Sequence, residues 1–564
     1  MHRSIRIVLA VATAALAAAP SAAAAPALRG SVIADDMATL SRWSISGRPS
    51  RRALKIESGH TYAIDGRALR LGTGGSIRRA LPPRPWSLSL DVRMPRHGIL
   101  RIDLGGEPLV LQQRADGTLV AGAGESTGAT LPRGSAGPGG WHHVEMAGFD
   151  PVDLHVDGTR VPNQIRPGRR IGVRTLRRTA DLTGLVATRR DDRRALLLHR
   201  LASIHARAPA RRFPIGSDAQ GRLRFEDGPS SGFWPGSLWR AYALTGARLF
   251  RDWGEKATWD QFGHEPPPHV QQAGLRFLES SGGDELATCR PRRGHRCRVI
   301  RKSVGKTAGS LFGMTQGNPG TWALPTVIWP NRCATCASAD EVEIRIDSMM
   351  DIGIVEQNAL AAERSQDAET HATAVRRHAE TVARLLVRED GSTIEAVRAN
   401  RLDGTVLGYP RTHAANEGSV WARGQAGAIY GFARSGLALR QPAFLATAER
   451  AARYLESRLP PSPRIPPDDL ASVDGQPWDT GAGALAAAGL LRLSDACERI
   501  AGVCADGARW DALGRAVLDA VLARVSTFAP LGVLPEDAYE RGGDAGEHLL
   551  GADFALEAIA RAAR

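Results

Sequence analysis

The stretch Ala206-Arg-Ala-Pro-Ala-Arg-Arg-Phe-Pro214 separates two parts of the chain that differ in hydrophobic pattern. It contains two prolines and no apolar period, which is typical of a linker. Before it, apolar and polar residues alternate, and after it apolar residues recur about every 3.6 positions. The sequence therefore predicts a multidomain protein, with a β-sandwich over residues 31–207, a linker over 208–215 and an all-α domain over 216–564.

The first of these domains is built from short alternating runs, such as Trp86-Ser-Leu-Ser-Leu-Asp-Val92 and Ile99-Leu-Arg-Ile-Asp-Leu104. Turn dipeptides such as Asp116-Gly117 separate them, and no long helical period interrupts them, which favours a sandwich. The segment Trp141-His-His-Val144, followed by Val152-Asp-Leu-His-Val-Asp-Gly-Thr159, resembles a strand pair of concanavalin A-like and laminin-G-like sandwiches. That resemblance implies carbohydrate binding.

Arginines crowd the end of this domain, where they form either a solvated rim or a patch that holds an anionic glycan. They are Arg166, Arg169, Arg170, Arg174, Arg177, Arg178, Arg189, Arg190, Arg193 and Arg194.

The second domain shows a run of amphipathic segments joined by Gly- and Pro-rich connections, with no β-rich block between them. The predicted helices are 236–242, 349–362, 368–388, 420–435, 442–459, 481–493, 509–525 and 547–563. Helices that keep pairing over this length favour a toroid or solenoid of helical hairpins over a four-helix bundle.

The chain of 564 residues is basic, with 73 Lys and Arg against 59 Asp and Glu and a net charge of +14. Arg3 and Arg6 precede the apolar run Ile7 to Ala19, so residues 1–25 are expected to be a secretory signal peptide. No later segment is long and apolar enough for a membrane span. Export makes an anionic glycan a better partner than nucleic acid, and it places the protein outside the cell or at the cell wall.

Six cysteines form three local pairs: Cys289 with Cys297, Cys333 with Cys336, and Cys497 with Cys504. Local disulfides agree with export. The alternative is a zinc site that combines the C-x-x-C pair with another pair. The other two pairs do not repeat this spacing, so disulfides are favoured and no metal is expected.

Asp347 lies between the alternating run Glu341-Val-Glu-Ile-Arg-Ile346 and a predicted helix, and two interpretations stay open. Ser348 and Asp351 have the spacing of a capping box, beside which Asp347 favours the helix N-terminus. Alternatively, apolar neighbours desolvate Asp347 and raise its pKa, so that it donates a proton near neutral pH.

Two further clusters contain aromatic side chains. Trp421 and Gln425 share a helix face, and Arg423 lies beside them. These side chains are either ordinary packing, or a sugar-binding platform in which the guanidinium holds a carboxylate at two points. The segment Ser231-Gly-Phe-Trp-Pro-Gly-Ser-Leu-Trp239 leads into a helix, either as core or as the lip of a pocket.

From about Gly216 onward, seven ordered motifs resemble the unsaturated glucuronyl hydrolases, glycoside hydrolase family 88. They are Ser231-Gly-Phe-Trp-Pro-Gly-Ser-Leu-Trp239, Ile346-Asp-Ser-Met-Met350, Arg388-Glu-Asp-Gly-Ser-Thr393, Thr412-His413, Ser419-Val-Trp-Ala-Arg-Gly-Gln-Ala426, Asp479-Thr-Gly-Ala-Gly-Ala-Leu-Ala-Ala-Ala-Gly-Leu-Leu491 and Gly551-Ala-Asp-Phe-Ala-Leu-Glu557. The resemblance implies an (α/α)6 barrel, no metal or other cofactor, and a substrate of unsaturated uronyl oligosaccharides left by polysaccharide lyases.

The resemblance also implies residue roles. Asp347 matches the family's general acid and base, which protonates C4 of the C4=C5 vinyl ether and then helps water add at C5. The hemiketal that results opens, and the glycosidic bond is lost. The sugar-contacting residues implied are Trp234, Gln272, His413, Trp421 and Arg423.

The sequence departs from the family pattern at several of these places. Gln271-Gln-Ala-Gly-Leu275 is the nearest match to the H-D-x-G-F motif, so Gln272 stands where a second active-site Asp is expected. Glu395 stands where the family has a His after D-G-S-T. Ala414 replaces the family's Gln after Thr-His, and Gly427 replaces a Trp.

The sequence therefore predicts a secreted glycoside hydrolase that acts on anionic, uronate-containing oligosaccharides, with Asp347 as proton donor. One alternative is a non-catalytic binder of acidic polysaccharide that uses the arginine patch. Another is a polysaccharide lyase on a similar helical toroid.

Overall fold

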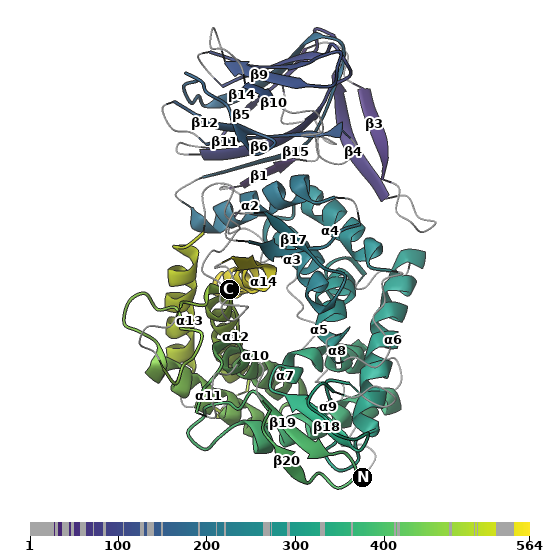
Figure 1. The fold of residues 1–564 in the computed structure, drawn as a ribbon, viewed down its shortest axis with the longest axis vertical. Coiled ribbons are helices and arrows are strands. Elements are labelled where there is room, and N and C mark those ends of the chain that lie inside the picture. Colours follow the sequence, from purple (N-terminus) through teal and green to yellow (C-terminus); the bar gives the residue numbers. More distant parts are fainter. Residues whose placement is uncertain are drawn as a thin grey trace.

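The computed structural model shows a β-domain standing on a larger body of helices arranged around a common centre (Figure 1). It describes residues 28, 32–35, 44–46, 50–56, 64–71, 73–82, 86–104, 107–123, 129–131, 140–147, 151–189, 192–209, 211–218, 222–262, 271, 273–289, 294–327, 333–361, 365–410, 413, 418–472, 477–500, 502–504, 506–525 and 546–564. The predicted signal peptide and Gln272 lie outside these residues.

The β-domain consists of two antiparallel sheets. Its strands are β1 (Val32–Asp35), β2 (Ser44–Ser46), β3 (Ser50–Ile56), β4 (Ile64–Leu71), β5 (Ser76–Ala80), β6 (Trp86–Arg93), β7 (Ile99–Asp103), β8 (Leu109–Gln113), β9 (Leu119–Ala123), β10 (Ala129–Leu131), β11 (His142–Ala147), β12 (Asp153–Val156), β13 (Thr159–Arg160), β14 (Arg170–Arg177) and β15 (Ala180–Arg189). The eight-stranded sheet has the order β13-β12-β11-β6-β15-β4-β3, with β1 also paired to β15. The seven-stranded sheet has the order β10-β9-β8-β7-β14-β5-β2.

Alternating side chains of the two sheets form one core, as expected for a sandwich. Leu100 and Ile102 of β7 are buried with Leu88 and Leu90 of β6 in the same cluster. Trp86 is also buried there, and its indole N–H donates to the carbonyl of Gly168 at 3.1 Å. The sandwich therefore has its own hydrophobic core.

The last part of the predicted β-region is helical. Helix α2 (Arg193–Arg207) begins at Asp192, whose carboxylate accepts from the backbone N–H groups of Arg194 and Ala195. Its leucines are buried with the helical body rather than between the sheets. The expectation of strands up to Arg207 is wrong, because an N-cap and a continuous apolar run over 196–198 start a helix.

Each range predicted as a helix contains helix in the structure, although 349–361 is divided between two helices and 547–548 form a strand, and the body has further helices. Its helices are α3 (Phe233–Thr245), α4 (Arg248–Asp260), α5 (Ala273–Phe277), α6 (His295–Gln316), α7 (Ser348–Asp351), α8 (Gly353–Ala361), α9 (Ser365–Leu386), α10 (Ala422–Leu439), α11 (Pro442–Arg458), α12 (Thr480–Arg499), α13 (Gly507–Leu522) and α14 (Leu549–Ala562), and its short 3-10 or π-helical turns are η3 (Pro229–Gly232), η4 (Leu278–Gly282) and η5 (Glu285–Cys289). The sequence missed α4 and α6, although their apolar residues Leu249, Phe250, Ile300 and Val304 are buried.

This body is not all-α, which corrects the sequence prediction. One three-stranded sheet pairs β16 (Pro214–Ser217) with β17 (Leu223–Phe225) and with β21 (Glu547–His548) near the C-terminus. A second sheet has the order β18 (Glu341–Arg345), β19 (Ala396–Asn400), β20 (Val406–Gly408). Part of the predicted linker is therefore strand β16, which joins distant parts of the chain.

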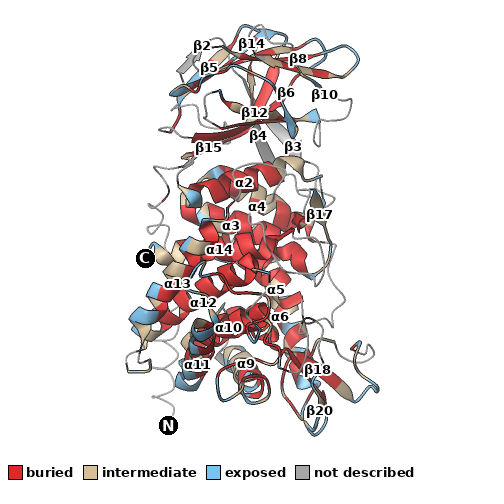
Figure 2. Ribbon diagram, turned by 60° about the vertical axis from the view of Figure 1, so that its left-hand side comes forward, coloured by how far each residue is buried: buried red, intermediate tan, exposed pale blue. Residues whose placement is uncertain are grey.

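The eight-stranded sheet rests on α2 and α4 (Figures 1 and 2). Val186 of β15, Ala202 of α2 and Leu249 of α4 form a small buried cluster. Beside it, the Ser203 hydroxyl donates to the Glu145 carboxylate of β11, and the guanidinium of Arg200 lies 3.6 Å from the same carboxylate. Apolar and charged contacts therefore both hold the sandwich on the helices.

All six cysteines form disulfides, which pair Cys289 with Cys297, Cys333 with Cys336, and Cys497 with Cys504. The predicted local pairing is confirmed, and the zinc alternative is left without free thiols. Among the described residues, no helix combines the length and apolar character needed to cross a bilayer.

Buried ion pairs connect α3, α14, α12 and η4 near the centre of the body. The guanidinium of Arg240 on α3 contacts Glu279 at 2.6 Å, Asp553 at 3.0 Å and Glu557 at 3.1 Å. Glu557 of α14 also pairs with Arg492 of α12. Burial disfavours the charged form of Arg240, but the three acids outweigh burial and raise its pKa.

Further polar contacts extend this series of ion pairs into a closed cycle. Arg492 donates to the Tyr430 hydroxyl of α10 at 2.9 Å, and Arg434 of α10 donates to Glu356 of α8 at 2.9 Å. Gln357 of α8 then donates to the carbonyl of Gly282 in η4 at 3.2 Å. Six helical segments are thereby linked in the order α3, α14, α12, α10, α8, η4.

We expect Arg240→Met to destabilise the protein by about 3–5 kcal/mol, because the variant leaves buried carboxyl groups without their counter-charge. Thermal or urea unfolding measures this loss. Arg499→Met, which removes a surface pair with Asp495, is the control and should change stability little. A small loss for Arg240→Met, similar to the control, would contradict the assigned role of the cycle.

Candidate active site

Asp347 lies where strand β18 turns into helix α7, and its side chain is partly exposed. Its carboxylate makes no capping hydrogen bond to α7. The hydroxyl of Ser348 donates instead to the carbonyl of Arg345 at 2.5 Å. The capping box that the sequence allowed is therefore not formed.

A second carboxyl group, Asp351, is buried on the next turn. The side-chain nitrogen of Gln271 donates to Asp351 at 2.8 Å and lies 3.4 Å from Asp347 Oδ1, so one amide bridges the two acids. Asp351 also accepts from the backbone N–H of Leu275 at 2.9 Å. Burial, together with the nearby Asp347 carboxylate, raises the pKa of Asp351 to about 8.

Strand pairing brings a third acid to the same edge. β18 and β19 are antiparallel with Arg345 opposite Ala396, and the backbone N–H of Ile346 donates to the carbonyl of Glu395 at 3.0 Å. Glu395 therefore emerges beside Asp347, although the two are 48 positions apart in sequence (395 minus 347).

Glu395 is buried and connects His413 to Arg345. Its carboxylate accepts from the backbone N–H of His413 at 2.9 Å and lies 3.0 Å from that imidazole. Arg345 contacts the same carboxylate at 2.9 Å. Burial disfavours the charged form of Arg345, but Asp347, Glu395 and Glu343 outweigh it and raise the pKa of the guanidinium.

An aromatic shelf borders these acids. The rings of His413 and Trp421 stack with centroids 4.3 Å apart and planes 7° apart, and both side chains are partly exposed. Helix α10 approaches Ile346 so closely that a Cβ on Gly424 would lie 2.8 Å from Ile346 Cγ2. Only glycine fits there, so Gly424 allows Trp421 to reach the Asp347 region.

Arg423 faces a protein carboxylate. Its guanidinium grips Asp479, the N-cap of α12, with nitrogen–oxygen distances of 2.8 and 3.1 Å, and the Arg423 side chain is 3% exposed. Gln425 is likewise buried, since its amide bonds the backbone of Thr393, Gly391 and Ala451. Both side chains hold the first turns of α10 in place.

Trp234 lies in the hydrophobic core of α3, 4% exposed, and stacks on His205 of α2 with centroids 6.3 Å apart. It belongs to the same hydrophobic cluster as Ile346 and Met349, which flank Asp347 in sequence. Gln272 lies outside the described residues.

Sequence reasoning missed Gln271, Asp351 and Arg345 as members of this cluster. Asp351 had a signal, because it lies one helical turn after Asp347, but the capping interpretation accounted for it. Gln271 is adjacent to the residue that was predicted. In the described residues, therefore, Asp347, Asp351, Glu395, His413 and Trp421 gather in one region.

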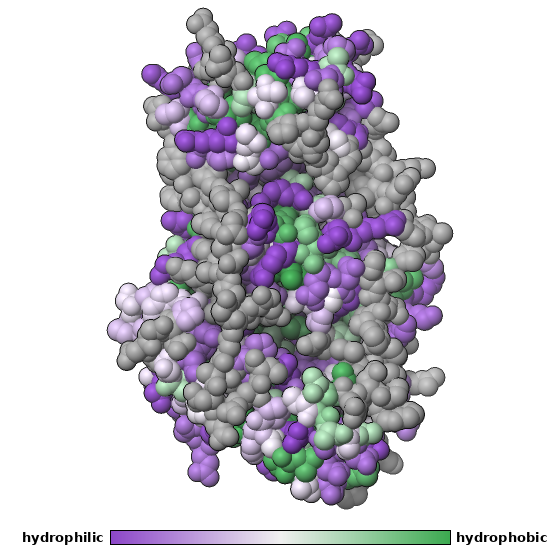
Figure 3. Space-filling view, viewed as in Figure 1, coloured by the Kyte–Doolittle hydropathy of each residue, from purple (hydrophilic) through white to green (hydrophobic). Residues whose placement is uncertain are grey.

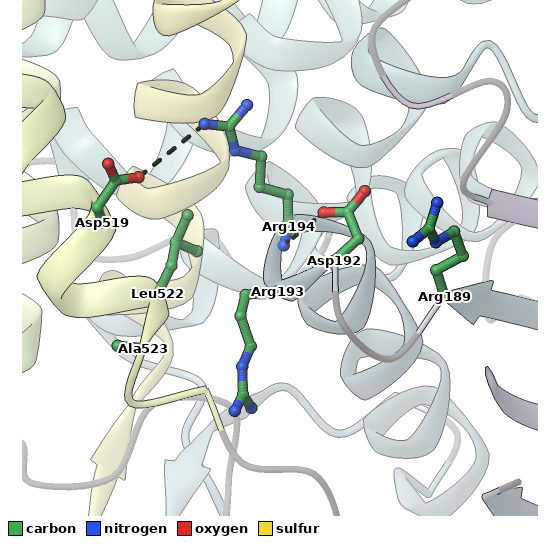
Figure 4. A pocket seen from close by; sticks show the side chains of 7 residues that line it. All are labelled: Arg189, Asp192, Arg193, Arg194, Asp519, Leu522 and Ala523. Carbon is green, nitrogen blue, oxygen red and sulfur yellow. Dashed lines mark hydrogen bonds and ion pairs between the residues drawn. The ribbon is translucent and has the colours of Figure 1, made fainter. Parts of the chain in front are cut away.

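The C-terminal end of the predicted arginine patch lines a different cavity, of about 550 Å³, between α2 and α13. The arginines do not converge on one point there (Figure 4). Arg194 turns toward Asp519 at 4.0 Å, and Arg193 donates to the carbonyl of Val525 at 3.1 Å. These side chains bind parts of the protein, so the cavity is not a focused anion site.

The chemistry that the Asp347 region can support depends on which of its carboxyl groups are protonated. Below about pH 8 the buried Asp351 holds a proton, while Asp347 lies partly exposed beside it. Two carboxyl groups in different environments suit acid–base chemistry. The aromatic shelf provides a flat apolar surface next to them.

Asp351 predicts a specific dependence of stability on pH. Because its folded pKa of about 8 exceeds the ordinary Asp value of about 3.9, its contribution is complete at low pH and is lost as the pH rises toward 8. Asp351→Asn should flatten the fall of the melting temperature between about pH 5 and 8. If wild type and variant lose stability in parallel over this range, Asp351 does not hold the proton.

Comparison with known proteins points to one group. No family model matches the chain. The unsaturated glucuronyl hydrolase of Formosa agariphila is 26% identical over 267 residues, which are 47% of this chain and 62% of that protein. The unsaturated glucuronyl hydrolase of Bacillus sp. strain GL1 is 27% identical over 289 residues, or 50% of this chain and 72% of that protein. The chain thus spans less than two thirds of the Formosa protein.

Solved structures agree with this similarity. An unsaturated glucuronyl hydrolase specific for heparin superposes with a TM-score of 0.57 at 20% identity, over 66% of this chain and 96% of that chain. The Bacillus sp. GL1 enzyme gives 0.56 at 20% identity, over 65% of this chain and 94% of that chain. About two thirds of the chain therefore shares the fold of the unsaturated glucuronyl hydrolases.

Proposed function

We propose that the protein is a secreted hydrolase that removes unsaturated uronyl residues from anionic oligosaccharides by hydrating their C4=C5 bond. The observation that carries this proposal is the pair of Asp347 and Asp351, bridged by Gln271 beside the aromatic shelf of His413 and Trp421. Sequence similarity to proteins named unsaturated glucuronyl hydrolase supports the same assignment.

In the proposed reaction, the partly exposed Asp347 carboxylate takes up a proton from solvent and gives it to C4 as the C4=C5 π bond opens. Positive charge develops between C5 and the ring oxygen, and the Asp347 carboxylate then takes a proton from the water that attacks C5. The hemiketal opens to a ketone at C5, and the exposed anomeric centre releases the rest of the oligosaccharide. Both proton transfers need one carboxyl group, unlike schemes in which two acids flank the anomeric carbon.

Asp351 would serve this reaction by staying neutral. A second carboxylate beside Asp347 would repel an anionic sugar, whereas a protonated Asp351 adds no charge below about pH 8. Gln271 contacts both acids, so it fixes the orientation of Asp347. Asp351 would thereby supply the second carboxyl group that the Gln271-Gln272 sequence lacks.

Around these acids, Trp421 and His413 would contact the sugar ring, and Glu395 would orient His413 through the short contacts already described. Arg423 would act indirectly, because its two-point fork is directed at Asp479. Trp234 and Gln272 remain proposed parts of the site on the family resemblance alone.

We further propose that the six helical segments of the polar cycle are the inner ring of an (α/α)6 barrel. The closed order α3, α14, α12, α10, α8, η4 supports this arrangement. Three local disulfides support export to an oxidising compartment, where the predicted signal peptide would direct the chain. The sandwich would be a concanavalin A-like domain attached to this barrel.

Asp347→Asn tests the proposed function. We expect kcat on lyase-generated unsaturated disaccharides to fall by about 100- to 10,000-fold, because the amide cannot deliver the proton. The loss of ultraviolet absorbance from the C4=C5 bond follows the reaction, and Asp367→Asn on the exposed start of α9 is the control.

Three results would overturn parts of this account. An Asp347→Asn variant as active as wild type would remove Asp347 from the reaction. A wild-type protein that consumes no unsaturated disaccharide but binds acidic polysaccharide would favour the non-catalytic alternative. Absorbance that appears on intact polysaccharide would indicate a lyase.

A further inference from the structure

The seven-stranded sheet of the sandwich has one face turned away from the helices. In Figures 1 and 2 its strands β5 and β14 lie on the far side of the sandwich, whereas β15 of the other sheet faces the helical body. The eight-stranded sheet is covered by α2 and α4. In Figure 3, hydrophilic residues are frequent along the coloured part of the outer edge of the sandwich.

Strand alternation places arginines on this outer face. Ile77, Ile102 and Val173 are buried in the sandwich core, so their neighbours Arg78, Arg101 and Arg174 point outward. Arg170 points outward four residues before Arg174 on the same strand.

The register brings these charges together across three strands. Arg101 of β7 is directly opposite Arg174 of β14. Arg78 of β5 is opposite Gly172, which lies two residues before Arg174 on β14 and therefore on the same face of the sheet. Like charges directly opposite on neighbouring strands are destabilising, so this arrangement costs the fold stability.

Few acids compensate these charges. Arg101 contacts Asp103 at 2.8 Å, but within the described part of the chain Arg78, Arg170 and Arg174 have no carboxylate partner. All three of these side chains are exposed. The outer face thus carries guanidinium groups whose counter-charge must come from solution or from a ligand.

Small residues lie beside the arginines on this face. Ser76 is opposite Arg174, and Gly122 is opposite Val110, which is itself opposite Arg101. Gly172 has no side chain, and a Cβ built there would lie 3.5 Å from the Cγ of Arg78 and 3.5 Å from the Cβ of Asp103, the acid opposite Gly172 on β7. The guanidinium groups are therefore the projecting features of a shallow surface, and their planar forks suit carboxylate and sulfate groups.

We propose that this outer face, formed by Arg78, Arg101, Arg170 and Arg174, binds the chain of an anionic polysaccharide, separately from the active site. An extended polyanion can satisfy several guanidinium groups at once, which a single small anion cannot. The surface would hold the protein on acidic polymer while the helical body acts on its fragments. The binding does not depend on the proposed reaction.

The test uses the full chain with Arg78, Arg170 and Arg174 all changed to Gln. The control changes Arg298, Arg384 and Arg464 to Gln, which removes three exposed arginines from the helical body and gives the same net charge. Binding to heparin and to polygalacturonate is measured at several salt concentrations, because the first carries sulfate and carboxylate and the second carboxylate only. A neutral dextran and double-stranded DNA complete the set.

We expect wild type and control to bind at least one anionic polysaccharide, and the sandwich variant to bind it at least tenfold more weakly. The slope of log K against log salt should fall by about 2 in that variant, since three charges no longer displace counterions. Turnover of unsaturated disaccharides should be unchanged. Equal weakening in both triple variants, no binding by wild type, or stronger arginine-dependent binding to DNA would each overturn the proposal.

Discussion

The ion pairs around Arg240 set the constraint on which the helical body depends. Three buried carboxyl groups from two other segments converge on this one guanidinium, which is itself partly exposed. Such a cluster is stable only when every member is present, because an unpartnered buried charge costs more than a pair contributes. The helices that supply its members must therefore close around a common centre, and the strand and helix ends that form the candidate site are fixed at the edge of that arrangement.

The candidate site resembles the Arg240 cluster in its electrostatics, because a buried Asp has a raised pKa in both. Around Arg240, burial and the neighbouring acids raise the pKa of Asp553 against the effect of the guanidinium, and around Asp347 a carboxyl group likewise lies beside another acid. Burial settles that conflict by keeping a proton on Asp351. A site prepared in this way accepts an anionic sugar more readily than one with two carboxylates, while Asp347 keeps its access to solvent.

The sequence predicted much of this architecture, because the spacing of apolar residues shows which face of each helix or strand is buried. The helices from 349 onward and the two-sheet domain follow from spacing alone, and the local cysteine pairs indicated disulfides. Hydrophobic periodicity did not predict helix α2, because its consecutive leucines are compatible with either a buried strand or a helix. The N-cap Asp192 is the signal that distinguishes the helix. The sheet of β16, β17 and β21 was missed because β16 pairs with β21, which lies more than 300 residues away.

Within the site, the sequence indicated Asp347, His413 and Trp421 but assigned less well the residues that depend on distant partners. Arg423 reads as a ligand anchor until Asp479 is placed opposite it. Asp351 reads as a helix cap until Gln271 and Leu275 are brought against it from another segment. Such assignments follow from tertiary contacts, which spacing along one helix does not report.

The central claim is that a proton reaches C4 of an unsaturated uronyl residue, and turnover in deuterium oxide tests it directly. If the account holds, the uronyl product carries one deuterium bonded to C4, detected by mass spectrometry and nuclear magnetic resonance. The same product prepared in ordinary water and then kept in deuterium oxide without enzyme corrects for later exchange beside the ketone. Release of the sugar with its C4=C5 bond intact and no deuterium on carbon would show cleavage at the anomeric carbon instead, and would contradict the account.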